Sequence, residues 1–184
     1  LVLQGINGIA SAHMKDVGLD TGYIATVLST HSLALAAFKF LTGILYDKFG
    51  GRKTILLCSI TATVVTAALA LITPSPTGQI LAMLYGIFSS LALPLETVML
   101  PLMTNDLFGS ADFDHLLGFF VSFNTAGYAV GNPLVNLCFD ALGTYVPILC
   151  VLSAVMLLVT VCYQLIFVQA ARDKVKILSE SHSA

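Results

Sequence analysis

The chain has 184 residues, of which 57% are hydrophobic and only 10% are charged, and its formal net charge is −2 at pH 7. Soluble domains carry about 25% charged residues, so this composition excludes an ordinary water-soluble domain and favours a protein embedded in lipid. The small negative net charge also argues against a basic surface for binding nucleic acid.

Apolar segments of the length needed to cross a bilayer, about 20 residues, follow one another along the chain. Residues 1–12 are interpreted as the end of a truncated spanning helix. The five complete predicted spans cover residues 22–46, 54–73, 79–104, 116–139 and 146–169. A polar tail is expected over residues 170–184, with fraying from residue 177. The sequence therefore predicts an all-α, polytopic transmembrane helix bundle that forms one domain.

Positive charge is distributed unevenly between the two ends of the predicted spans. Six of the eight lysine and arginine residues fall on one side when the spans alternate in direction, namely Lys48, Arg52, Lys53, Arg172, Lys174 and Lys176. Cytoplasmic loops of membrane proteins are enriched in lysine and arginine. We therefore expect a multi-pass protein of the cell membrane whose C-terminus is cytoplasmic.

The turn after the first complete span carries glycine and charged residues at a fixed spacing. The pattern G-x-x-x-D-K-x-G-x-R-K is formed by Gly43, Asp47, Lys48, Gly50, Arg52 and Lys53. It resembles the signature loop of the major facilitator superfamily, which lies between helices 2 and 3 and recurs between helices 8 and 9. The resemblance implies a membrane transporter. It predicts the C-terminal six-helix half of that fold, with its first helix truncated.

A second resemblance extends over the last three spans. Gly127, Gly131 and Pro133, with L-F-G at 107–109 and G-T-Y at 143–145, are similar to the oxalate/formate antiporter and monocarboxylate porter branch. This resemblance implies a symporter or antiporter for a small organic anion, such as a monocarboxylate. Independently of the family, Gly127 and Gly131 favour close helix packing, and Pro133 favours a bend.

The resemblance also implies a gate at the cytoplasmic end of the bundle. Asp47 is expected to cap the helix that begins near residue 116, where the positive end of the helix dipole favours an acid. Arg52 or Lys53 is expected to pair with Asp106 at the end of span 79–104. Such contacts would hold the cytoplasmic side closed.

Lys39 is the main candidate for substrate binding. It lies eight residues, or roughly 12 Å, before Asp47, and therefore near the middle of the bilayer. A lysine there costs about 2.5–3.5 kcal/mol, which an anion has to offset. The resemblance implies that the anion is a substrate carboxylate, and a structural ion pair with Glu96 is the alternative. Glu96 lies between Pro94 and Pro101, and broken helices are where transporters build their sites.

His31 and Asn124 complete the predicted substrate-binding residues. Glu96 or His31 is a candidate carrier of a coupled proton, although a polar lining of the outer cavity explains His31 equally well. Span 116–139 contains no lysine or arginine, so a monocarboxylate fits better than a dicarboxylate. The acid that monocarboxylate porters often place one turn before the cation is absent here, because position 35 is leucine.

Two other functions stay open. One is a drug or sugar carrier of the same superfamily. The other is a truncated, non-transporting membrane module, because the substrate cavity of this fold lies between two halves; a missing N-terminal half is then a candidate partner. We expect no enzyme, cofactor or metal site. The four histidines are far apart in the predicted topology, and the four cysteines match neither a zinc nor a disulfide pattern.

Overall fold

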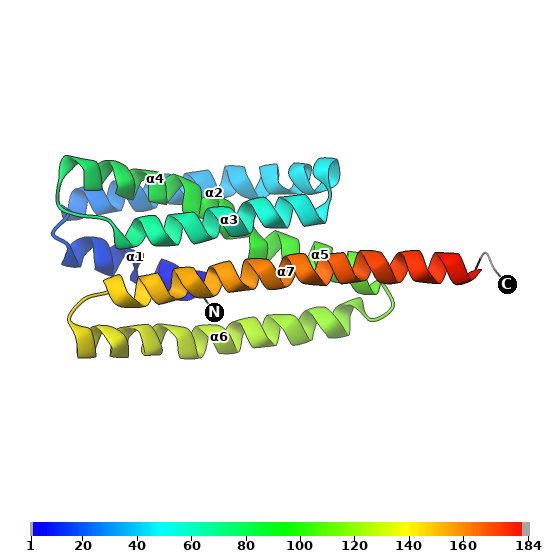
Figure 1. Ribbon diagram of the computed structural model, residues 1–184. Coiled ribbons are helices and arrows are strands. Elements are labelled where there is room, and N and C mark those ends of the chain that lie inside the picture. Colours follow the sequence, from blue (N-terminus) through cyan, green and yellow to red (C-terminus); the bar gives the residue numbers. More distant parts are fainter. Residues whose placement is uncertain (1, 182–184) are drawn as a thin grey trace.

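The chain folds into long helices that run roughly along one direction in the computed structural model (Figure 1). The structure describes the backbone of residues 2–181 and the side chains of residue 6 and residues 9–169. In chain order, the elements are α1 (Val2–Asp16), α2 (Thr21–Phe49), α3 (Gly51–Ala70), α4 (Pro76–Ala92), the π-helix η1 (Leu95–Met99), α5 (Leu100–Phe108), α6 (Phe113–Leu142) and α7 (Val146–Ser181). The predicted all-α fold class is confirmed.

Four stretches of the described chain are long and apolar enough to cross a membrane, and they match four of the five predicted spans. They cover residues 21–49, 51–70, 76–108 and 146–169. The predicted span 116–139 lies within the 30-residue α6, which is long enough to cross. Its asparagines and glycines make it less hydropathic than the other four, so its crossing stays a prediction.

Turn chemistry sets the ends of several helices. Asp20 accepts a hydrogen bond from the Tyr23 N–H at 3.0 Å and so caps α2. Gly50 joins α2 to α3 with φ 80°, and Gly143 ends α6 with φ 69°. Side chains with a Cβ rarely adopt this left-handed region, so glycine suits both turns. We call the two ends of the bundle the Gly50 end and the Gly143 end.

The last helix is longer than the sequence suggested. α7 continues to Ser181, whereas the span was expected to end at residue 169 and the tail to fray from residue 177. After Pro147 the chain contains neither glycine nor proline, so nothing in its backbone chemistry interrupts the helix. The remainder of the predicted tail, residues 182–184, lies outside the described residues.

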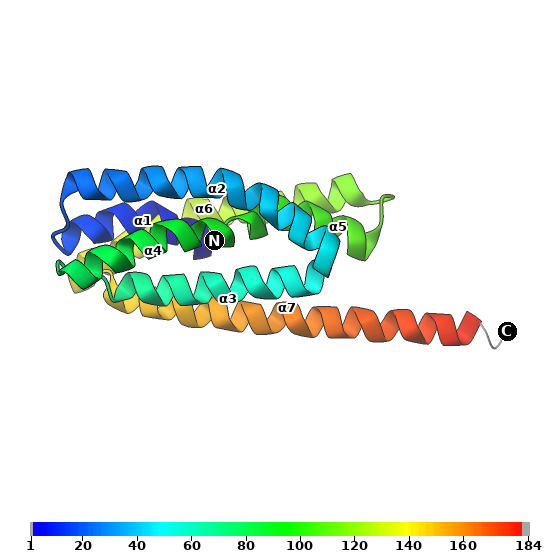
Figure 2. The same cartoon turned by 90° about the horizontal axis from the view of Figure 1, so that it is seen from above.

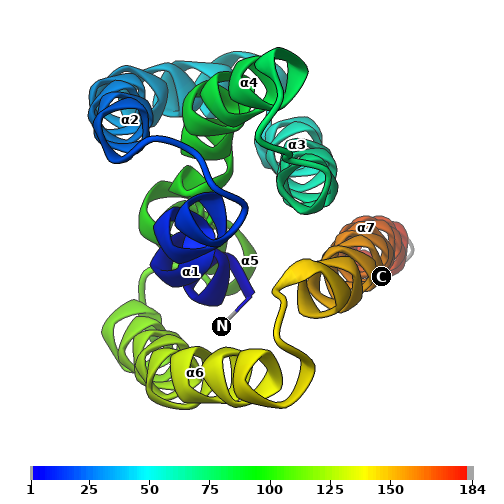
Figure 3. The same ribbon diagram turned by 90° about the vertical axis from the view of Figure 1, so that its left-hand side faces the viewer.

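The helices are arranged with α1 and α5 in the middle when the bundle is viewed along its length (Figure 3). α3 packs against α7 and α4, α2 packs against α4, and α1 packs against α6. Figure 3 shows α2 and α6 at separate edges and α3 beside α7. α2 and α6 thus flank α1 and α5, and α3 and α7 pack together farther from them.

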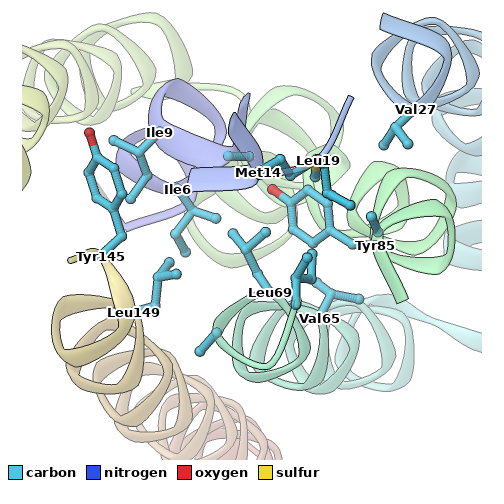
Figure 4. Close-up of a cluster of buried hydrophobic side chains, with 14 of the residues drawn as sticks. Ile6, Ile9, Met14, Leu19, Val27, Val65, Leu69, Tyr85, Tyr145 and Leu149 are labelled. Atoms are coloured by element: carbon cyan, nitrogen blue, oxygen red, sulfur yellow. The ribbon is translucent and has the colours of Figure 1, made fainter. Parts of the chain in front are cut away.

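The largest hydrophobic core lies towards the Gly143 end and joins six helices, namely α1, α2, α3, α4, α6 and α7 (Figure 4). Met14 of α1, Val27 of α2, Leu69 of α3 and Leu149 of α7 are almost fully buried in it. The ring of Tyr145, just before α7, packs into the same core. Burial raises the pKa of the Tyr145 phenol, and nearby carboxylates raise it further, so this group is neutral at ordinary pH.

Candidate functional site

A π-helix interrupts the path from α4 to α5. Pro94 and Pro101 have no N–H group, so neither can donate a helical hydrogen bond. Between them, the five residues of η1 form a wider turn that contains Glu96. π-turns inside longer helices are frequently found at functional sites. The break therefore places a half-buried carboxylate inside the 33-residue stretch that ends at Phe108.

The carboxylate of Glu96 acts electrostatically on two tyrosines from other helices. These are Tyr128 of α6 and Tyr163 of α7. Both tyrosines thus lie near enough to Glu96 to be affected by its charge. The sequence analysis did not single out either tyrosine as a neighbour of Glu96, because their proximity depends on how three helices pack.

Lys39 is exposed on a face of α2 that carries small and polar residues. Spacings of three and four residues place positions on the same side of a helix. The exposed members of this face that precede Lys39 at such spacings are Gly22, Ala25, Ser29, Ser32 and Ala36. Leu33 and Phe40 follow Ser29 and Ala36 by four residues and are 77% and 76% exposed on the adjoining part of the surface. Small and polar residues therefore lie with Lys39 along one edge of the exposed surface of α2, and large apolar residues lie along the other edge.

His31 points towards α4, away from the face that contains Lys39. Its Nδ1 lies 3.0 Å from the carbonyl oxygen of Gly86 and 3.0 Å from Oγ of Ser89. The Ser90 hydroxyl donates to the His31 carbonyl oxygen at 2.9 Å. Because a carbonyl only accepts, the bond to Gly86 puts the imidazole proton on Nδ1 and leaves Nε2 as an acceptor. The structure thus assigns His31 to the α2–α4 contact.

A glycine makes that contact close. A Cβ added at Gly86 would lie 2.9 Å from Cγ1 of Val27 and 3.0 Å from its carbonyl oxygen. Both distances are shorter than ordinary van der Waals contact, so only glycine lets α2 and α4 approach this far. The sequence analysis did not single out Gly86.

The predicted residues of α6 differ in their environments. Asn124 is half-buried, whereas Pro133 is exposed. Gly127 and Gly131 are buried, and α1 is the helix that α6 contacts most extensively. Their role in helix packing stays a prediction that agrees with this burial. The sequence analysis gave no special role to Asn132, whose buried Oδ1 has no hydrogen-bond partner.

The charged turn at the Gly50 end makes different contacts from those expected. Asp106 accepts a hydrogen bond from the Tyr46 hydroxyl at 2.5 Å, and the Arg52 Nε donates to Gln164 of α7 at 3.1 Å. The expected pairing of Asp106 with Arg52 or Lys53 is therefore wrong for this structure. Tyr46 bonds to Asp106 instead, because its ring packs across the start of α3.

Gly51 leaves room for this crossing. A Cβ at Gly51 would lie 2.7 Å from the Tyr46 hydroxyl oxygen and 2.8–2.9 Å from ring carbons. By contrast, Gly43 has no atom within 4 Å of such a Cβ. The phenol of Tyr46 is 8% exposed and packs beside Ile55 and Met99. One tyrosine thus connects α2, the start of α3 and α5.

The expected cap of α6 by Asp47 is not formed. Asp47 is exposed, Asp112 occupies the N-cap position of α6, and no side-chain hydrogen bond caps this helix. Asp47 therefore does not cap α6 in this structure. Within the described part of the chain, no three histidine, cysteine, aspartate or glutamate side chains lie close enough to hold a metal ion.

Comparison with known proteins gives one match. A sequence model of the Major Facilitator Superfamily matches residues 1–182. Neither a curated protein nor a solved structure matches the chain. The match extends over nearly all of the chain and includes every candidate site residue named above.

Proposed function

The chain belongs to the major facilitator superfamily of membrane transporters, and within that class we propose that it is half of a secondary transporter for a small organic anion, such as a monocarboxylate. The other half would be an N-terminal bundle of the same fold. Transport would proceed by alternating access, as symport or antiport. The Gly50 end, where Lys48, Arg52 and Lys53 gather, would face the cytoplasm of the cell membrane.

The observation that carries this proposal is the position of Lys39. It lies ten residues, or about 15 Å, from the end of α2 at Phe49. Since the hydrocarbon core is about 30 Å thick, the amine is near the middle of the bilayer. A cation at this depth needs water or an anion. Because Lys39 lies on the small, polar face of α2, a carboxylate that enters a cavity along this face would meet it.

Glu96 is the proposed carrier of a coupled proton. Glu96 is half-buried in a segment where the α-helical pattern is interrupted, and such breaks are where transporters build their sites. Protonation would remove the negative charge near Tyr128 and Tyr163. His31 and Asn124 are proposed as further polar residues of the pathway, His31 through the acceptor nitrogen Nε2.

The contact between Tyr46 and Asp106 is the proposed closing contact at the Gly50 end. It replaces the charge pair that the sequence suggested and connects α2 to α5. Lys39 lies on α2, and Glu96 lies in η1, which continues directly into α5, so the contact joins one helix that carries a proposed site residue to a helix that adjoins the other. Opening of the Gly50 end would break the contact, and Asp106 would then be solvated by water.

Uptake measurements with a Lys39→Gln variant test the proposal. Proteoliposomes that contain the protein together with its N-terminal half would be loaded with unlabelled lactate and assayed for counterflow of radiolabelled lactate, acetate and pyruvate. Loss of a desolvated charge partner costs about 2–5 kcal/mol, so we expect the apparent affinity to fall about 30-fold or more. Lys15→Gln is the matched control, because Lys15 is exposed near the end of α1.

Three outcomes would contradict the proposal. Equal counterflow by Lys39→Gln and the unmodified protein would remove the role of Lys39. Saturable uptake of a neutral sugar or a cationic drug without uptake of any monocarboxylate would favour the alternative carrier. Absence of counterflow for every solute, in a folded and correctly reconstituted sample, would favour a non-transporting module.

A further inference from the structure

A groove separates α2 from α3 near the Gly50 end. It has a volume of about 190 Å³ and is lined by Leu45 and Phe49 of α2 and by Lys53, Thr54 and Leu57 of α3. Figure 2 shows the two helices meeting at the Gly50 turn and separating from there. Apolar side chains form most of the groove walls, and the Lys53 amine supplies the cationic group.

This groove opens on a surface that suits hydrocarbon. Leu57, Ile60 and Val64 follow one flank of α3 at spacings of three and four residues and are 47%, 48% and 60% exposed. The flank of α3 that contacts α7 lies elsewhere, because Arg52 reaches Gln164. The groove therefore continues into an exposed apolar strip along a membrane-spanning helix.

Positive charge gathers at the rim of the groove. Lys53 lines it directly, and the Lys48 Nζ lies 5.7 Å from the ring centroid of Phe49, which forms part of the wall. Asp47 is the acid of the same turn. Since it is two residues from Phe49, it points to a different side of α2. The rim of the groove is thus positively charged, and its walls are apolar.

We propose that this groove binds one anionic glycerophospholipid from the adjacent leaflet. Part of an acyl chain would lie against Leu45, Phe49 and Leu57, and the phosphate would lie between the amines of Lys53 and Lys48. Sites that enclose a drug-sized ligand measure about 300–1,000 Å³, so this smaller groove holds only a segment of the chain. Basic pockets between spanning helices attract anionic head groups. The inference is independent of which solute is transported.

The absence of tryptophan from the sequence permits a site-specific test. Leu57→Trp places one fluorophore in the groove, and the protein is reconstituted in vesicles that contain phosphatidylglycerol or phosphatidylcholine with brominated acyl chains. We expect phosphatidylglycerol to show a relative binding constant about five-fold higher at this site. Lys53→Gln in the same background should remove most of this preference.

Arg52→Gln is the matched control, because it removes the same charge from the neighbouring residue, whose side chain bonds to α7 instead of lining the groove. It should keep the preference for phosphatidylglycerol. A second fluorophore at Ile80→Trp, near the opposite end of the bundle, should be quenched equally by both lipids. Equal quenching by both lipids at Leu57→Trp would overturn the proposal, and so would equal losses in the Lys53 and Arg52 variants.

Because Leu57→Trp changes the wall of the groove, native mass spectrometry of the protein without introduced tryptophan provides an independent test. After delipidation and addition of phosphatidylglycerol, the unmodified protein and Arg52→Gln should retain one lipid more than Lys53→Gln. Equal retention by all three proteins would show that the groove has no selectivity for the anionic lipid.

Discussion

Two glycines near the Gly50 turn, Gly51 and Gly43, should respond in opposite ways to the addition of one methyl group. At Gly51, the new Cβ would lie 2.7 Å from the Tyr46 hydroxyl oxygen, so the ring has to move. At Gly43, in the body of α2, the same atom would meet nothing within 4 Å. The comparison therefore isolates the space between Tyr46 and α3, because the chemical change is identical.

The expected magnitudes follow from packing and from one hydrogen bond. Overpacking costs about 1–3 kcal/mol. Displacing Tyr46 also breaks its bond to Asp106, which contributes about 1 kcal/mol because Asp106 is exposed and can be solvated instead. Gly51→Ala should therefore destabilise the protein by about 2–4 kcal/mol. Gly43→Ala should stabilise α2 by about 0.5–1 kcal/mol, because alanine is the better helix former.

Thermal unfolding in detergent provides the assay. For a chain of this size, 1 kcal/mol shifts Tm by about 2–4 °C, so the two variants should differ by more than about 5 °C. Tyr46→Phe should show only the loss of the hydrogen bond. Tyr46→Leu combined with Gly51→Ala should be more stable than the sum of the two single effects predicts, since the clashing ring is gone. If Gly51→Ala is as stable as Gly43→Ala, the crossing of Tyr46 over Gly51 is refuted.

Two further predictions concern α4 and the break that follows it. Gly86→Ala should lower the stability by about 1–3 kcal/mol in the same unfolding assay. Combining it with Val27→Ala should recover part of that loss, because this removes Cγ1, which the new Cβ would meet. An unaltered Tm for Gly86→Ala would contradict the close α2–α4 contact. Glu96→Gln should make solute counterflow independent of pH, and an unchanged pH profile would remove Glu96 from proton coupling.

The sequence determined the parts of this protein that depend on local chemistry. Long apolar segments with polar turns between them predict membrane helices because every backbone group in lipid has to be bonded within its own helix. Gly50 and Gly143 lie in turns because their positive φ values suit glycine. Pro94 and Pro101 indicated a weakened helix at Glu96, since each removes a backbone donor. The signature turn was enough to recognise the family.

Only the tertiary structure decided which side chains meet between helices. Asp106 bonds to Tyr46 instead of a basic residue, His31 bonds to Gly86, and Tyr128 and Tyr163 lie near the charge of Glu96. Each of these contacts depends on the rotation of a helix about its axis and on the distance to its neighbour. A residue spacing fixes positions around one helix, but the neighbour's orientation results from packing along its whole length.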